Sequence, residues 1–226
     1  MRIVTIIPAL DEEAAIGGVV RTISRALVQE VIVVDNGSHD GTAAVAQAAG
    51  ATVIQEPRRG YGAACLAGAR AARHADILVF LDGDGSDDPA ELPRVLHPLL
   101  HDQADLVLGS RMQGQDDHSG LTPQQRVGNC VVTSLVRVLY GVALTDIGPF
   151  RAITQSTFQA LGMEHQTYGW PVEMVVKAAK QGHRIVEVPV SCHKRLGRSK
   201  VAGTLTGSLL AGYHLLRTTL RYAWRD

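Results

Sequence analysis

Short apolar runs recur along the first half of the chain, and a stretch with helical spacing of apolar residues follows most of them. The runs at residues 3–7, 31–34, 52–54, 77–81 and 106–108 show no polar alternation, which is typical of strands buried in a parallel sheet. Residues 12–27, 42–49 and 62–73 fit helices between these strands, and Asp88-Pro89 fits the capped start of another. This succession predicts an α/β fold with a doubly wound, mostly parallel sheet.

The second half of the chain changes character. Residues 127–139 predict a helix, 150–153 a short strand, and Pro171 the start of a helix over 172–180. The β-rich run at 184–190 contains a late proline, Pro189, of the kind found in edge strands. We therefore expect one domain over residues 1–204 and an extension after it.

Residues 205–226 predict a C-terminal amphipathic helix, with basic residues in a row beside an apolar stripe. The stripe consists of Leu205, Leu209, Tyr213, Leu216, Leu220 and Trp224. An apolar face edged with cations is typical of a helix that lies in a membrane interface. Packing on the sheet or on another subunit is the alternative, so a homo-oligomer stays open.

Composition and charge narrow the classes of function. The chain has 226 residues, 46% of them hydrophobic, and Lys+Arg 22 balances Asp+Glu 22, so no overall charge favours nucleic acid. Residues 177–226 nevertheless hold ten basic side chains against two acidic ones, as expected for contact with phosphates or an anionic surface, or for solvated charge. Cys65, Cys130 and Cys192 fit no disulfide or zinc spacing and predict buried thiols in a reducing compartment. With neither a signal-like start nor an apolar run of about 18 residues, the sequence predicts a cytoplasmic protein.

Two carboxylates directly follow the predicted strand at 77–81. Asp82 and Asp84 stand at i and i+2, with Gly83 between them to let the backbone turn. In open α/β sheets, ligands bind beyond the carboxyl ends of the strands. Two hard oxygen ligands there suit Mg²⁺ or Mn²⁺ held together with substrate phosphates. An ordinary Asp/Gly turn is the alternative interpretation.

Ordered blocks of sequence carry a resemblance to a known family. They are Pro8-Ala9-Leu10-Asp11-Glu12, Val34-Asp35-Asn36-Gly37-Ser38, Arg59-Gly60-Tyr61-Gly62, Leu81-Asp82-Gly83-Asp84-Gly85, Gly109-Ser110-Arg111, Arg126-Val127-Gly128-Asn129, Asp146-Ile147-Gly148-Pro149-Phe150-Arg151 and Gly197-Arg198-Ser199-Lys200. The first four resemble the PxYNE, VDDGS, RGKG and DxD markers of family 2 glycosyltransferases with a GT-A fold. The later blocks resemble the dolichol-phosphate mannose synthase and polyprenyl-phosphate glycosyltransferase branch.

The resemblance implies inverting transfer of a sugar from a nucleotide-diphosphate sugar, with Mg²⁺ or Mn²⁺ as cofactor. It assigns the metal to Asp82 and Asp84, with Ser86 where the family often has Gln. The residues it assigns to the donor and its phosphates are Pro8, Leu10, Glu12, Asp35, Arg59, Gly83, Arg111, Arg126, Lys194, Arg195, Arg198 and Lys200. Three of the departures are Leu10 for Tyr, Tyr61 for Lys and Lys194 for Arg, so either Lys194 or Arg195 contacts the donor.

The acceptor decides whether the enzyme needs a general base. The resemblance implies a polyprenyl phosphate at the cytoplasmic, inner face of the membrane, and a lipid phosphate is already anionic. A hydroxyl acceptor needs a carboxylate base, for which Glu173 and Asp146 are candidates, although either fits a structural partner of an arginine. Tyr168 and Trp170 fit sugar stacking or core packing equally well. A soluble transferase for a small hydroxylated acceptor and a non-catalytic nucleotide-sugar-binding module stay open.

Overall fold

The computed structural model describes residues 1–114, 120–196, 217–219 and 221–222 of the chain. The predicted stripe of the C-terminal helix therefore lies outside the described residues, as do Arg198, Lys200 and the expected domain boundary at 204. Within the described part, no helix combines the length and the apolar character needed to cross a membrane.

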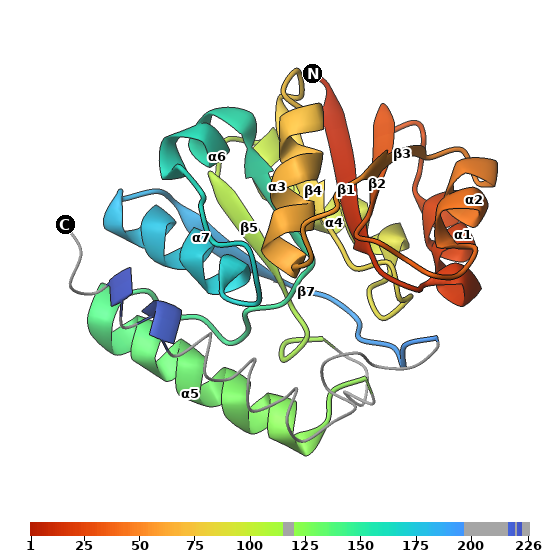
Figure 1. The fold of residues 1–226 in the computed structure, drawn as a ribbon. Helices are drawn as coiled ribbons and strands as arrows, with labels where there is room; N and C mark the ends of the chain where they lie inside the picture. The colour runs from red at the N-terminus through yellow and green to blue at the C-terminus, as the bar shows by residue number, and fades with distance from the viewer. Residues whose placement is uncertain (115–119, 197–216, 220, 223–226) are drawn as a thin grey trace.

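The described residues form a seven-stranded sheet between two layers of helices (Figure 1). The strands lie in the spatial order β3 (Thr52–Gln55), β2 (Glu30–Asp35), β1 (Ile3–Ala9), β4 (Ile77–Phe80), β6 (Arg151–Thr154), β5 (Leu106–Ser110) and β7 (Ile185–Pro189). Only β6 runs antiparallel to its neighbours among these strands. The predicted doubly wound, mostly parallel sheet is confirmed, and β7 lies at an edge, as Pro189 indicated.

Alternate residues of the strands point to two separate cores. Val4 and Ile6 of β1 pack beneath α3 (Tyr61–Ala71), α6 (Gln155–Leu161) and α7 (Trp170–Lys180). Ile3 and Ile7 face the opposite way, against α1 (Glu13–Thr22), α2 (Thr42–Ala48) and α4 (Leu92–Leu100). The near-continuous apolar runs of the strands thus follow from burial on both faces of the sheet.

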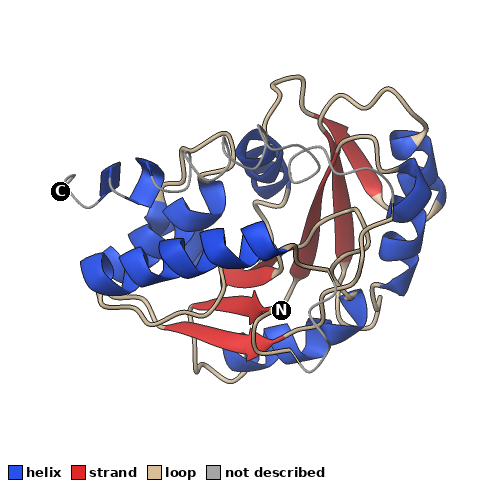
Figure 2. Ribbon diagram, turned by 90° about the horizontal axis from the view of Figure 1, so that it is seen from below, coloured by secondary structure: helices blue, strands red, loops and turns tan. Residues whose placement is uncertain are grey.

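The long helix α5 (Pro123–Tyr140) lies below α7 in Figure 1 and is seen from beneath in Figure 2. Thr122 and Gln125 form a capping box at its start, and Pro123 fills the first turn. These caps explain why the helix begins four residues earlier than the apolar pattern at residue 127 indicated.

Several local predictions can be checked directly. The Asp88 N-cap is confirmed, because its Oδ1 accepts a hydrogen bond from the Ala90 backbone N–H (2.9 Å), and a 3₁₀ turn, η1 (Pro89–Glu91), leads into α4. The first helix ends at Thr22 instead of residue 27, since Ile23 adopts an extended conformation and is buried. The cysteine prediction is wrong at Cys130, which is exposed on α5, whereas Cys65 and Cys192 are buried.

Candidate functional site

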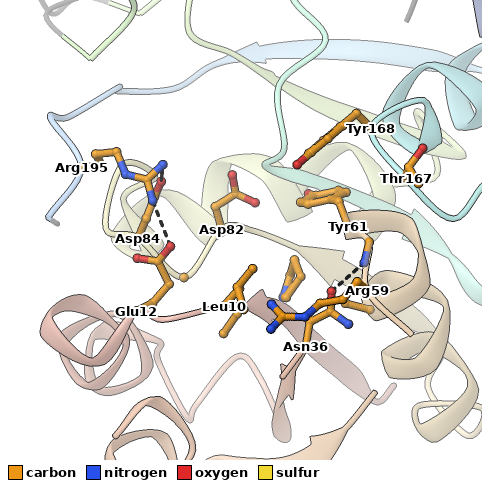
Figure 3. Close-up of a pocket in the computed structure, with 15 residues that line it drawn as sticks. Leu10, Glu12, Asn36, Arg59, Tyr61, Asp82, Asp84, Thr167, Tyr168 and Arg195 are labelled. Carbon is orange, nitrogen blue, oxygen red and sulfur yellow. Dashed lines mark hydrogen bonds and ion pairs between the residues drawn. The ribbon is translucent and has the colours of Figure 1, made fainter. Parts of the chain in front are cut away.

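The loops after β1, β2 and β4 surround a cavity of about 370 Å³ (Figure 3). These three strands are parallel neighbours, so their carboxyl ends meet at one edge of the sheet. From β1 the chain first continues to β2, on one side of β1, and later to β4, on the other side. Ligands bind at this reversal of strand order in open α/β sheets. Residues predicted for the site that line this cavity are Pro8, Leu10, Glu12, Arg59, Asp82, Gly83, Asp84 and Arg195.

A second cavity, of about 570 Å³, adjoins the first. Both are lined by Asp82, Asp84, Arg195, Tyr61 and Tyr168, so the two aspartates stand at the boundary between them. The second cavity also brings in predicted residues from distant segments: Ser86, Arg111 and Lys194. The structure therefore presents two compartments that share one acidic wall.

The turn that carries the aspartates has a defined backbone. Asp84 Oδ1 accepts a hydrogen bond from the Ser86 N–H (2.9 Å). Gly85, with a φ of 77°, supplies the left-handed residue, whereas Gly83 is a glycine because a Cβ there would press against Ile7 and Ile16. Gly83 thus lies in the turn, as expected, and Gly85 adds the left-handed conformation next to it.

A third carboxylate, that of Asp87, binds the backbone at the start of this turn. Its Oδ2 accepts a hydrogen bond from the Asp82 N–H (3.1 Å), and its side chain is almost fully buried. Burial raises the pKa of Asp87 to about 7. Burial, and then the negative charges of Asp84 and Asp87, raise the pKa of Asp82 well above its usual value. Clustered carboxylates with little solvent are stabilised by a nearby cation.

Arg195 supplies a cation at this place. Its Nη1 lies 3.3 Å from Asp84 Oδ2 and its Nη2 lies 2.9 Å from Glu12 Oε1, so the guanidinium bridges the loops after β4 and β1. Lys194 lines only the second cavity of the two. Of the two basic residues that the sequence left open, Arg195 is therefore the one at the boundary.

The side of the cavity toward β2 is built around Asn36. Its Oδ1 accepts from the Gly60 N–H and its Nδ2 donates to the Arg58 carbonyl, both at 2.8 Å, which holds the turn that presents Arg59. Arg58 itself lines a different, small cavity. Asp35 does not line this cavity either; its Oδ1 accepts from the Ser38 N–H (2.9 Å) and so shapes the loop.

The wall opposite β2 comes from the start of α3 and the segment before α7. Gly60 has a φ of 144°, and a Cβ there would overlap the Gln166 carbonyl oxygen. This close approach brings Thr167 and Tyr168 beside Tyr61 at the cavity. Tyr168 is thus available to a ligand, and Thr167 was not anticipated because the segment before α7 carries no recognisable pattern.

Two aromatic residues next to this wall belong to the core. Trp170 is fully buried, and its ring meets that of Tyr61 edge-on at 6.1 Å between centroids. This position favours core packing over sugar stacking for Trp170. The Tyr61 hydroxyl is buried, and no hydrogen-bond partner of good geometry exists for it among the described residues.

Arg111, which lines the second cavity, forms an ion pair with the fully buried Asp146. Arg111 Nε and Nη2 donate to the two carboxylate oxygens of Asp146 at 2.7 and 2.9 Å. Burial acts to lower the pKa of Arg111, but the Asp146 charge outweighs it and raises the pKa. Asp146 is fully buried, so the structural alternative applies to it. Arg126 lies in the first turn of α5, next to Gln125, which lines the second cavity.

Glu173 lies away from both cavities. It is fully buried on α7, and its Oε1 lies 2.9 Å from Lys177 Nζ. Its carboxylate also accepts hydrogen bonds from the Glu164 and His165 N–H groups and from the Tyr222 hydroxyl. The structure does not bring Glu173 to the aspartates and favours the structural alternative over a role as base.

The two carboxylates at the boundary between the cavities suit a divalent cation that has further ligands from outside the protein. The described residues contain no cluster of three or more His, Cys, Asp or Glu side chains with metal-binding geometry. Two carboxylates, Asp82 and Asp84, are what Mg²⁺ typically uses together with substrate phosphates and water. The residues therefore suit a metal that arrives with a phosphate ligand.

The fold and the candidate site are typical of α/β enzymes whose substrates bind beyond the carboxyl ends of parallel strands. The family model of glycosyl transferase family 2 matches residues 4–162, and the chain belongs to this family. The predicted GT-A fold and the assignment as a glycosyltransferase are thereby confirmed.

Curated relatives agree over nearly the whole chain. A glycosyltransferase of Mycobacterium tuberculosis is 38% identical over 210 residues, covering 92% of this chain and 94% of the relative. An undecaprenyl-phosphate mannosyltransferase of Micrococcus luteus is 34% identical over 221 residues, covering 92% of this chain and 90% of the relative.

Solved structures show the same fold. Glucosyl-3-phosphoglycerate synthase from M. tuberculosis, solved with phosphoglyceric acid, has a TM-score of 0.79 and 26% identity, over 98% of this chain and 80% of its own. The same enzyme with Mn²⁺, UDP-glucose and phosphoglyceric acid has a TM-score of 0.78 and 25% identity, over 98% and 79% of the two chains. A further structure of it holds Mg²⁺ and UDP.

Proposed function

We propose that this enzyme transfers a sugar, with inversion, from a nucleotide-diphosphate sugar to a polyprenyl-phosphate-type lipid, and that it depends on Mg²⁺ or Mn²⁺. The observation that carries the proposal is the position of Asp82 and Asp84 on the wall shared by two adjoining cavities. A transferase needs one compartment for the donor, one for the acceptor and the reacting bond between them. The mannosyltransferase relative, whose acceptor is undecaprenyl phosphate, supports the choice of acceptor.

The first cavity suits the nucleotide and its diphosphate. Leu10 and Pro8 give it an apolar side, while Arg59 and Arg195 bring positive charge. Arginine forks bind phosphate oxygens in a bidentate manner. Asp84 and Asp82 would hold the metal, which supplies charge neutralisation for the departing diphosphate.

The second cavity suits an acceptor phosphate. Lys194 provides a movable positive charge, and Thr122, Gln125 and Ser86 provide polar groups on the same lining. A phosphate oxygen would attack the anomeric carbon from the side opposite the diphosphate, and the bond from that carbon to the diphosphate oxygen breaks as the new bond forms. Because the attacking phosphate is already anionic, no carboxylate base is needed, which agrees with the position of Glu173 outside both cavities.

A small phosphorylated acceptor is the second candidate. The similar synthase binds phosphoglyceric acid, and the same polar lining of the second cavity suits the phosphate of such a molecule. The two acceptors differ in their apolar part, since a polyprenyl chain requires a membrane. They also differ in the attacking group, since a hydroxyl of the small molecule would need a base to take its proton. We place the lipid reaction at the cytoplasmic face, where the predicted C-terminal amphipathic helix would contact the bilayer. A nucleotide-sugar-binding module without turnover is the remaining alternative.

A donor screen followed by an acceptor assay tests the proposal. UDP-, GDP- and dTDP-sugars are added with and without Mn²⁺, and the donor is identified by a rise in melting temperature, because a ligand that binds the native state stabilises it. The labelled donor is then offered to undecaprenyl phosphate in vesicles and to 3-phosphoglycerate in solution. We expect metal-dependent labelling of the lipid. Labelling of 3-phosphoglycerate alone would select the second candidate, and donor binding without either product would refute an enzymatic role.

A further inference from the structure

Both carboxylate oxygens of Asp84 have partners in the structure. Oδ1 accepts the Ser86 N–H, and Oδ2 lies 3.3 Å from Arg195 Nη1. The same guanidinium holds Glu12 through Nη2 at 2.9 Å. A metal ion that binds Asp84 through Oδ2 therefore enters a position that an arginine already neutralises.

The backbone places Arg195 at this position. The His193 N–H donates to the Ser86 carbonyl and the Leu196 N–H donates to the Asp84 carbonyl, both at 2.9 Å. Leu196 also lies over Gly85, since a Cβ on that glycine would be 3.6 Å from it. The segment around Arg195 thus runs along the aspartate turn and is held there by main-chain contacts.

The guanidinium is nevertheless incompletely satisfied. Its Nε is buried and has no hydrogen-bond partner within the part of the chain that the structure describes. A buried N–H without a partner is unfavourable, so a new acceptor for it would stabilise the complex. A diphosphate in the first cavity, which Arg195 also lines, offers oxygen acceptors and negative charge.

We propose that Arg195 takes the place of the divalent cation in the donor-free enzyme and moves from Asp84 to the diphosphate when metal and donor enter together. This inference rests on the proposed function, because it assumes that Asp84 binds the metal. Metal alone then competes with Arg195 and binds weakly. Metal with a nucleoside diphosphate binds tightly, since the diphosphate provides Arg195 with a new partner.

This exchange makes the two ligands depend on each other. By linkage, the factor by which the diphosphate improves metal affinity equals the factor by which the metal improves diphosphate affinity. Removing the guanidinium removes both the competitor for Asp84 and the partner for the diphosphate. The affinity for metal alone should therefore rise while the coupling between metal and diphosphate falls.

The test measures Mn²⁺ binding directly, by calorimetry and by the electron paramagnetic resonance signal of free Mn²⁺. Wild type, Arg195→Gln, Lys194→Gln and Asp84→Asn are compared without nucleotide and with UDP or GDP, whichever the wild type binds. We expect R195Q to bind Mn²⁺ alone about tenfold more tightly than wild type, and the gain from added nucleotide to shrink by about tenfold. Lys194 is the matched control, because it adjoins Arg195 in the chain and lines only the second cavity.

The outcomes separate this inference from the proposed function. If R195Q binds Mn²⁺ alone no more tightly than wild type does, the inference is overturned. The proposed function still stands in that case if wild type holds Mn²⁺ in the presence of nucleotide and D84N does not. An equal rise in K194Q also overturns it, since a general loss of positive charge would then explain the effect. If neither nucleotide lets wild type hold more Mn²⁺ than D84N does, the metal site fails, and the proposed function fails with the inference.

Discussion

Replacement of Glu173 by alanine should destabilise the protein without removing the chemistry. Glu173 is fully buried, and its carboxylate pairs with Lys177 at 2.9 Å. It also accepts the Glu164 and His165 N–H groups at 3.0 and 2.8 Å and the Tyr222 hydroxyl at 2.7 Å. The variant leaves a mostly buried ammonium and two backbone donors without this acceptor.

The expected cost follows from these contacts. Breaking a buried ion pair by removal of one partner costs about 3–5 kcal/mol. The two backbone donors lie at the start of the segment that carries Thr167 and Tyr168, so we also expect a raised KM for the donor. A general base would behave differently: its loss lowers kcat by about 10²–10⁴ and leaves stability largely unchanged.

Urea unfolding and initial rates distinguish the two cases. The free energy of unfolding is measured first, and turnover is then measured at a temperature at which circular dichroism shows the variant to be folded. Glu164→Gln is a control on the same segment. Glu164 is exposed, and glutamine keeps an oxygen that can accept the Tyr222 hydroxyl. Substitutions at the surface usually change stability by less than about 0.5 kcal/mol. Wild-type stability of Glu173→Ala together with a hundredfold loss of kcat would refute the structural role.

Two further substitutions test the site and its wall. Asp84→Asn should lower kcat/KM at least about a hundredfold, since a metal stabilises the transition state by several kcal/mol and each 1.4 kcal/mol is worth about tenfold in rate. Asp88→Asn, which keeps a helix cap, should leave kcat/KM unchanged. Similar rates in both variants would contradict the role of Asp84. Gly60→Ala should lower the melting temperature, because a Cβ would overlap the Gln166 carbonyl at a φ of 144°. Gly128→Ala, with open space around it in α5, should raise stability by about 0.5–1 kcal/mol, and an unchanged melting temperature for Gly60→Ala would show that the wall is not tightly packed.

The apolar pattern predicted most of the sheet because burial on both faces leaves a strong local signal. The central strands β1, β2 and β4 lie where their apolar runs placed them, and the edge position of β7 followed from Pro189. The direction of β6 did not follow, since it depends on pairing with β4 and β5, which no local pattern encodes. The seven-residue helix α6 is too short to show a helical period.

The same distinction applies to the site. Glu12, Arg59 and Asp84 could be predicted because each follows the end of a strand or a recognisable block. The placement of Arg195 could not, because its partner Glu12 is 183 positions away in the chain and the contact depends on main-chain bonds to the aspartate turn. Thr167 reaches the cavity through the close approach of two backbones, which a sequence does not display.

Four carboxylates were candidates in the sequence, two as metal ligands and two as a general base, and the structure separates them by what surrounds their oxygens. Asp146 accepts hydrogen bonds from Nε and Nη2 of Arg111, and Glu173 pairs with Lys177. Each of these two carboxylates is therefore already neutralised by a structural partner. Asp82 and Asp84 face two cavities, and the cation beside Asp84 comes from a segment held by two main-chain bonds. A buried charge with a permanent partner stabilises one structure, whereas a charge whose partner can be exchanged is able to bind a ligand. On this argument we propose the acidic wall, and not the buried pairs, as the place of the reaction.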